Sequence, residues 1–177
     1  MSTGTHPQTT QVGKQVISNG LTIIGTEAGC GKTVFMTGLA AMLRQQGVAL
    51  GAVKPISFAS KDRAESEISF ICSISGTPRN YATTVISSAK NLSEAQWEHS
   101  LSIGRDSSRF MFVETPGGCA SPMSFEQNSV GTLAHSWKDT RDFARELGYS
   151  CVIVAHHNQD AIEKLVLAYS YLHELPI

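Results

Sequence analysis

Short apolar runs alternate with longer amphipathic segments along the chain. The runs "LTIIGT", "VALGAVKPI", "RFMFVET" and "CVIVA", which begin at positions 21, 48, 109 and 151, are expected to be strands. Short, β-branched runs of this kind are typical of strands buried on both faces of a sheet. Apolar residues at helical spacing predict helices over residues 32–47, 61–75, 92–104, 140–148 and 159–175.

The order of these segments indicates the fold class. Buried strands that alternate with helices argue for an α/β domain with a mostly parallel sheet and helices on both faces. We expect this domain to span residues 19–177, preceded by a disordered tail over residues 1–18 that is rich in Thr, Gln and Ser. Residues 76–91 show no clear pattern. The large aromatic side chains are interpreted as helix packing residues: Trp97, Trp137, Tyr169 and Tyr171.

Composition narrows the classes of partner. The chain of 177 residues has a formal net charge of -1 and 16% charged residues, so it offers no general electrostatic attraction to nucleic acid or to an anionic membrane. No apolar run approaches the ~18 to 20 residues that a membrane-spanning helix needs. The 4 cysteines are scattered, which fits free thiols in a reducing compartment. We therefore expect a soluble, cytoplasmic protein whose partners are small molecules or protein surfaces.

The stretch "GTEAGCGKT", which begins at Gly25, lies between a predicted strand and a predicted helix. In this arrangement, backbone N–H groups of a glycine-rich turn and of a helix N-terminus converge on phosphate oxygens. Gly29 and Gly31 supply the backbone freedom that such a turn requires. Lys32 would reach the terminal phosphates, and Thr33 would bind Mg²⁺. The alternative interpretation is a glycine-rich turn that only ends a strand. The leading glycine, Gly25, stands one place earlier than in the regular motif G-x-x-x-x-G-K-[ST].

A carboxylate and a glycine-rich turn follow another predicted strand. Glu114 lies at the end of the run "RFMFVET". Because the carboxyl ends of strands form the ligand crevice of an open α/β sheet, Glu114 could face the Mg²⁺ held by Thr33. Gly117 and Gly118 make a loop with few side chains, which suits either backbone contact with a substrate or an ordinary turn.

A second lysine stands at the end of the second predicted strand. Lys54 occupies this position, and Ser57 follows it. A lysine there would point into the same crevice and could balance an anion. A lysine on a loop is more commonly a solvent-exposed side chain. The prediction that Lys54 points into the crevice therefore depends on the presence of Lys32 and Glu114 at the same crevice.

Three motifs in this order resemble the dethiobiotin synthetase family. The loop of that family reads G-T-x-x-x-x-G-K-T, with the same early glycine. Its K-P-[VI] and V-E-G-A-G-G motifs also have counterparts here. The matching residues are Gly25, Thr26, Gly31, Lys32, Thr33, Lys54, Pro55, Ile56 and the segment "VETPGG" over residues 113–118. The resemblance implies an α/β fold of the P-loop NTPase type.

The resemblance also implies a reaction, the Mg-ATP-dependent carboxylation of 7,8-diaminopelargonic acid with closure of a ureido ring to dethiobiotin, a step of biotin biosynthesis. ATP and Mg²⁺ are the implied cofactors, and the small-molecule substrates are the diamino acid and bicarbonate or CO₂. By analogy, Lys32 and Lys54 are catalytic. The implied metal ligands are Thr33, Glu67 and Glu114. Nucleotide binding is assigned to Gly25, Thr26, Gly29, Cys30, Gly31, Lys32, Thr33 and Val34, and substrate binding to Lys54, Ser57, Gly117 and Gly118.

Two alternatives to this reaction stay open, and the resemblance further implies a homodimer. The family usually carries a polar residue and a glutamate where this chain has Ala28 and Gly29, and we expect the domain to lack the family's C-terminal part. Both features favour a shortened, catalytically weak nucleotide-binding module with a regulatory or assembly role. The loop alone is shared with amide ligases such as cobyrinic acid a,c-diamide synthase, which is the second alternative.

Overall fold

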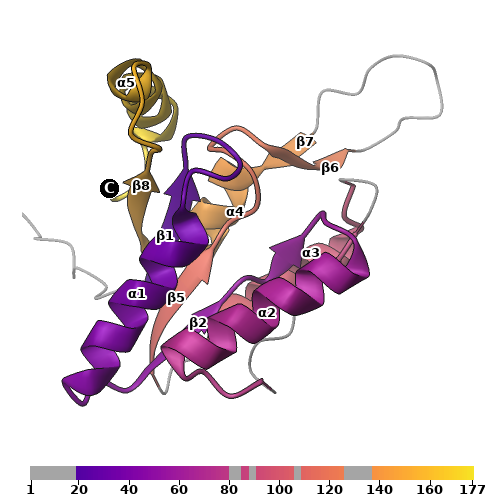
Figure 1. Cartoon of the computed structure of the whole chain (residues 1–177). Helices are drawn as coiled ribbons and strands as arrows, with labels where there is room; N and C mark the ends of the chain where they lie inside the picture. Colours follow the sequence, from indigo (N-terminus) through magenta and orange to yellow (C-terminus); the bar gives the residue numbers. More distant parts are fainter. Residues whose placement is uncertain (1–18, 80–84, 88–90, 106–108, 126–136) are drawn as a thin grey trace, which may run out of the picture.

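A computed structural model of the protein describes residues 19–79, 85–87, 91–105, 109–125 and 137–177. Its centre is a parallel sheet of four strands in the order β2-β5-β1-β8, as Figure 1 shows. These strands are β1 (Gly20–Gly25), β2 (Leu50–Val53), β5 (Phe110–Glu114) and β8 (Ser150–Val154). The α/β fold class of the P-loop NTPase type, with a mostly parallel sheet, is confirmed.

Helices cover both faces of the sheet (Figure 1). They are α1 (Lys32–Gln45), α2 (Lys61–Ser75), α3 (Glu94–Gly104), α4 (Thr140–Leu147) and α5 (Ala161–Leu172). On one face, α1 and α2 pack through a core that includes Met36 and Phe112. On the other face, α3 and α4 pack through a core that includes Trp97 and Val113. Phe112 and Val113 are neighbours in β5, and they reach opposite cores because side chains alternate along a strand.

Local signals in the sequence set several helix boundaries. Ser93 caps α3, because its hydroxyl accepts from the backbone N–H of Gln96 while the Gln96 side chain accepts from that of Ser93. Asp139 and Asp142 form a reciprocal cap of the same kind at the start of α4, and the helix is closed by Gly148, which has φ of 74°. At Gly31, α1 begins without a capping side chain, so its first N–H groups remain available to a ligand.

Two short sheets were not predicted from the pattern. Strands β3 (Ile56–Ser57) and β4 (Val85–Ile86) pair in parallel, and β6 (Pro122–Phe125) pairs antiparallel with β7 (Trp137–Asp139). Strands this short give no readable period. The interpretation of Trp137 and Tyr169 as helix packing residues is wrong, since Trp137 lies on β7 and is 51% exposed, while Tyr169 is 60% exposed. Trp97, in contrast, is fully buried as expected.

Other expectations about the chain as a whole have mixed outcomes. The predicted tail over residues 1–18 lies outside the described residues. Across the described ranges, no helix has both the length and the apolar character needed to cross a membrane. All cysteines are free thiols, as the sequence predicts.

Candidate functional site

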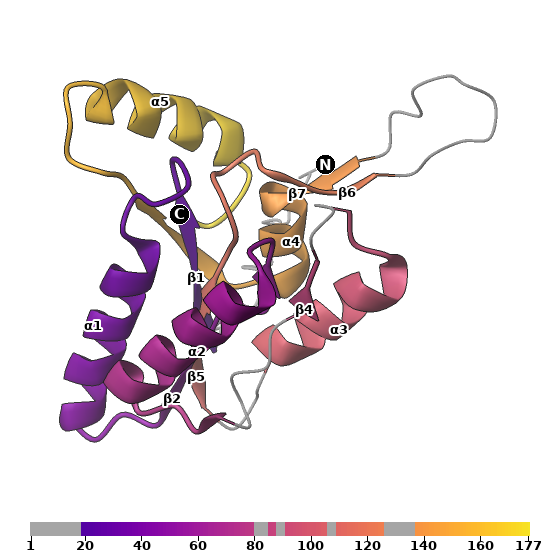
Figure 2. The same ribbon diagram turned by 45° about the vertical axis from the view of Figure 1, so that its right-hand side comes forward.

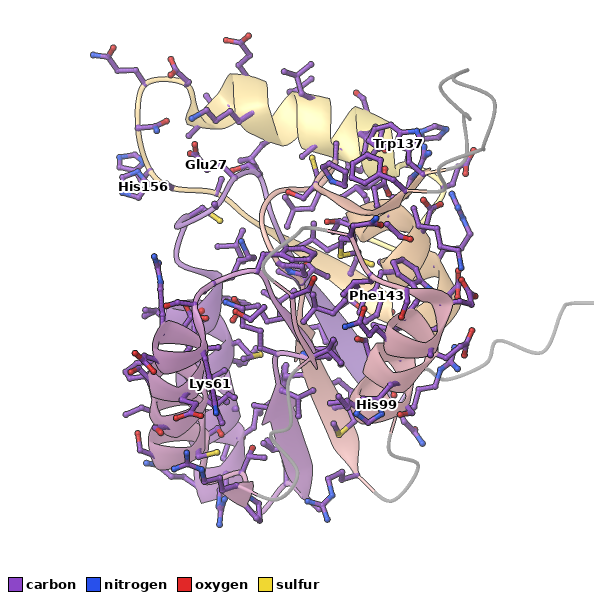
Figure 3. All side chains as sticks on the ribbon, turned by 90° about the vertical axis from the view of Figure 1, so that its right-hand side faces the viewer. Glu27, Lys61, His99, Trp137, Phe143 and His156 are labelled. Atoms are coloured by element: carbon purple, nitrogen blue, oxygen red, sulfur yellow. The ribbon has the colours of Figure 1, made fainter. Side chains whose placement is uncertain are left out.

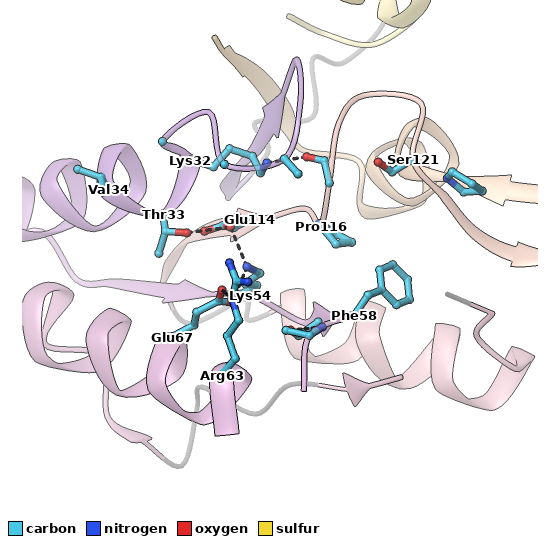
Figure 4. Close-up of a pocket in the computed structure, with 17 residues that line it drawn as sticks. Lys32, Thr33, Val34, Lys54, Phe58, Arg63, Glu67, Glu114, Pro116 and Ser121 are labelled. Carbon is cyan, nitrogen blue, oxygen red and sulfur yellow. Dashed lines mark hydrogen bonds and ion pairs between the residues drawn. The ribbon is translucent and has the colours of Figure 1, made fainter. Parts of the chain in front are cut away.

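Three adjacent strands bring the predicted site residues together. The phosphate loop, the stretch "GTEAGCGKT" over residues 25–33, joins β1 to α1. Lys54 follows β2, and Glu114 ends β5. In the sheet, β5 lies between β1 and β2. The register pairs Ile23 with Glu114 and Val53 with Val113. Because the strands are parallel, their carboxyl ends open on the same edge of the sheet. Motifs that are far apart in the chain therefore surround one cleft (Figure 4).

The phosphate loop has a backbone suited to an anion. Gly29 and Gly31 have φ of 75° and 98°, in the left-handed region that favours glycine. Gly25 is required for a different reason, because a Cβ there would lie 2.7 Å from both Lys32 Nζ and Cys30 Sγ. The first turn of α1 carries no acidic residue. Its N–H groups and helix dipole can therefore attract a phosphate.

The side chain of Lys32 is buried and bridges two loops. Its ammonium donates to the backbone oxygen of Gly117 at 2.6 Å and to that of Glu27 at 3.2 Å. Burial lowers the pKa of Lys32, although the charge of the nearby Glu114 opposes this effect. A nucleotide phosphate would give the ammonium a charged partner in place of neutral carbonyl groups.

Glu114 is the most buried carboxylate of the site, with 2% of its surface exposed. Its Oε1 accepts from the Thr33 hydroxyl at 3.0 Å and lies 3.2 Å from Lys54 Nζ. Its Oε2 is buried and has no hydrogen-bond partner among the described residues. A buried carboxylate oxygen without a partner is costly, which indicates a place for a ligand.

Lys54 connects two carboxylates. Its ammonium lies 2.7 Å from Glu67 Oε2 and 3.2 Å from Glu114 Oε1. Glu67 also faces Arg63, whose Nε lies 3.5 Å from Oε1. Burial lowers the pKa of Lys54, but the charge of Glu114 and the hydrogen bond to Glu67 outweigh it, so the net pKa is raised. Lys54 is therefore held as a cation at the base of the cleft.

These side chains face a pocket of about 580 Å³, drawn in Figure 4. The predicted site residues that line it are Gly29, Gly31, Lys32, Thr33, Val34, Lys54, Ser57, Glu67, Glu114 and Gly117. Four others are not part of this lining: Gly25, Thr26, Cys30 and Gly118. The Cys30 side chain turns away and donates from Sγ to the backbone oxygen of Val154 at 3.2 Å. A contribution of these four residues to nucleotide binding stays a prediction.

Sequence reasoning missed several residues of the pocket lining, among them Phe58, Arg63 and Ser121. For Arg63 a signal existed, because it lies one helical turn before Glu67, where opposite charges pair on a helix surface. Phe58 and Ser121 lie in turns beside the motifs, and no pattern marks them.

Comparison with known families places the chain in one family. The profile of the AAA_26 family, an AAA domain, matches residues 19–175, which include the loop, Lys54 and Glu114. The chain belongs to this family. The AAA_26 family includes dethiobiotin synthetase-like P-loop proteins, and membership indicates a P-loop domain that binds a nucleotide. A search of the curated proteins found no match to the chain.

A P-loop domain of the AAA_26 family usually takes its nucleotide with Mg²⁺, and the residues present fit that ion. The Thr33 hydroxyl and the unpartnered Glu114 Oε2 are hard oxygen donors at the same point of the cleft. Among the described residues, no group of three or more His, Cys, Asp or Glu side chains could hold a metal. One hydroxyl and one carboxylate suit Mg²⁺, which is typically held by one or two carboxylates together with phosphate oxygens and water. The assignment of Glu67 as a further ligand stays a prediction.

Replacing Gly25 with alanine tests the tight packing of the AAA_26 loop. The added Cβ would meet Lys32 Nζ, Cys30 Sγ and, at 2.8 Å, the backbone oxygen of Glu27. We expect Mg-ATP affinity to fall roughly tenfold or more and the free energy of unfolding to fall by about 1 to 3 kcal/mol. Calorimetric titration and denaturant unfolding measure the two effects.

Gly38→Ala is the matched control for this variant. Gly38 lies in α1, and nothing lies within 4 Å of a Cβ built on it. Its replacement should leave affinity unchanged and stabilise the helix by up to about 1 kcal/mol. Equal affinities in the Gly25→Ala variant and the wild type would contradict the packing argument.

Proposed function

We propose that the protein is an Mg-ATP-dependent ligase of the dethiobiotin synthetase type. It would carboxylate 7,8-diaminopelargonic acid and close the ureido ring, releasing dethiobiotin, ADP and phosphate. The observation that carries the proposal is the convergence of Lys32, Thr33, Lys54 and Glu114 on one pocket. Membership of the AAA_26 family supports the nucleotide half of the reaction.

The proposed reaction depends on positioning and on charge neutralisation. One amine of the acceptor captures CO₂ as a carbamate, and a carbamate oxygen attacks the γ-phosphorus of ATP while ADP leaves. The second amine then attacks the carbonyl carbon and expels phosphate, which closes the ring. Lys32 would neutralise the transferring phosphate, and Lys54, held as a cation by Glu67 and Glu114, would lie beside the carbamate.

The Mg²⁺ ion, held by Thr33 and Glu114, would supply charge neutralisation at the phosphates when it is bound. Gly117 and Ser57 both line the pocket, and the Gly117 backbone and the Ser57 hydroxyl would orient the acceptor. Phe58 and Pro116 form an apolar part of the same lining. An aliphatic chain between the reacting amines and the rest of the acceptor would fit against that part.

Product analysis with two acceptors tests this proposal. The purified protein is incubated with Mg-ATP, bicarbonate and 7,8-diaminopelargonic acid, and separately with cobyrinic acid and an ammonia donor. The proposal predicts dethiobiotin in the first reaction and no amide in the second. An amide product alone would replace it with the cobyrinic acid a,c-diamide synthase alternative.

The second candidate is a nucleotide-binding module without ligase activity. Ala28 and Gly29 line the pocket, so neither a hydroxyl nor a carboxylate reaches it from these positions. This favours weak catalysis. Mg-ATP binding without any product from either acceptor would support this candidate against the ligase.

We also propose that the protein acts as a homodimer. A row of exposed apolar side chains on α5, spaced at i, i+3, i+4 and i+7, supports the contact: Ile162, Leu165, Val166 and Tyr169. The row is symmetric about its midpoint, so two antiparallel copies would place Ile162 opposite Tyr169 and Leu165 opposite Val166, as a two-fold contact requires. Light scattering should give twice the chain mass of 19.0 kDa, and a monomer would contradict this.

A further inference from the structure

The phosphate loop contains a carboxylate that does not face the pocket. Glu27 lies in the loop, and its side chain turns towards α5 (Figure 3). There Lys164 Nζ lies 2.9 Å from Glu27 Oε1 and 3.1 Å from Oε2. The hydrogen bond to Glu27 raises the pKa of Lys164. Two segments far apart in the sequence are therefore joined by a bidentate ion pair.

Glu27 is placed where its charge and backbone both affect the site. Its backbone oxygen accepts from Lys32 Nζ at 3.2 Å, so this residue touches the lysine expected to meet the phosphates. The loop around it is tightly packed, because a Cβ on Gly118 would lie 3.3 Å from Glu27 Cα. A free carboxylate at this point would repel a polyanion that binds to the same loop.

Helix α5 holds Lys164 at this position from outside the pocket. The helix runs past the loop (Figure 2), and its buried side chains, Ala168 and Leu172, lie in its second half. In its first half, Ile162 and Val166 are exposed. Lys164 thus provides a specific tie between the first half of α5 and the phosphate loop.

We propose that Lys164 is a positioning residue for nucleotide binding, which neutralises Glu27 and holds its carboxylate away from the phosphates. This inference rests on the proposed Mg-ATP site but not on the identity of the acceptor. The pair is partly solvent-exposed, with 33% and 39% of the two side chains exposed. Exposed ion pairs contribute little to stability. The effect should therefore appear in nucleotide affinity, not in the unfolding temperature.

Calorimetric titration of the full chain with Mg-ATP at low ionic strength tests the proposal. Lys164→Met keeps most of the side-chain volume and leaves Glu27 unpaired, so affinity should fall by about three- to fivefold. The loss should shrink at high salt, because salt screens exposed charges. Adding Glu27→Gln to Lys164→Met removes the unpaired charge and should restore affinity to within about twofold of the wild type.

Glu174→Gln is the matched control. Glu174 lies just beyond α5 and pairs with Arg145 of α4 at 3.1 Å. Its replacement removes an ion pair next to the C-terminal end of α5 without touching the phosphate loop. It should bind Mg-ATP like the wild type. The role of Lys164 is overturned if Lys164→Met binds as tightly as the wild type, if Glu27→Gln fails to rescue it, or if Glu174→Gln loses as much affinity. Absence of binding by the wild type would overturn the nucleotide site itself, and the role of Lys164 with it.

Discussion

Replacing Lys32 with alanine will abolish nucleotide-dependent turnover and lower Mg-ATP affinity by roughly 100-fold or more. The reason is geometric, because Lys32 is the buried cation that lines the pocket and joins the phosphate loop to Gly117. Removing it leaves the γ-phosphate without its main positive partner. Product formation and calorimetric titration with Mg-ATP measure the two losses.

Lys61→Ala serves as the control for Lys32→Ala. Lys61 begins α2, its side chain is 78% exposed, and it does not line the pocket. Its removal lowers the net charge by the same amount without touching the site, so affinity and turnover should stay at wild-type values. Turnover that survives in Lys32→Ala would mean that the pocket is not where ATP reacts.

Replacing Glu114 with glutamine will lower turnover by roughly 100-fold and raise the Mg²⁺ concentration needed for half-maximal rate. The amide keeps the shape but loses the charge that holds Lys54 and faces the expected metal position. Binding of ATP without Mg²⁺ should persist, because the glycine loop and Lys32 remain. A Mg²⁺ titration of the rate, beside ATP binding with and without the metal, separates these effects.

Glu65→Gln is the control for Glu114→Gln. The Glu65 carboxylate lies on α2, is 50% exposed and pairs with Lys61 at 4.0 Å, away from the cleft. It should leave the Mg²⁺ dependence unchanged. An unchanged Mg²⁺ dependence in folded Glu114→Gln would remove Glu114 from the metal site.

Those parts of the fold that depend on local chemistry could be predicted from the sequence. The helix over residues 61–75 is found with the expected bounds. Ser93 caps a different helix, α3, because its hydroxyl can reach the free N–H groups of the first turn. The pairing of β3 with β4 could not be predicted, because two-residue strands are fixed by tertiary contacts and not by their own pattern.

The same division holds for the candidate site. Gly31, Lys32 and Thr33 are recognisable in the sequence because a phosphate bound at the start of a helix requires these residue types in this order. The position of Glu114 opposite Thr33 also follows from the neighbouring order of β1 and β5. Lys164 could not be found, since its partner in the loop is 137 positions away and the contact depends on where α5 lies.

Isotope transfer tests the central claim most directly. With ¹⁸O-labelled CO₂ in unlabelled water, the proposed attack of a carbamate oxygen on the γ-phosphorus places one ¹⁸O atom in the phosphate released beside dethiobiotin. The account predicts this singly labelled phosphate in step with product formation, read by mass spectrometry. Phosphate without label, released at the same rate whether or not the diamino acid is present, would mean that water attacks ATP and would contradict the ligase mechanism.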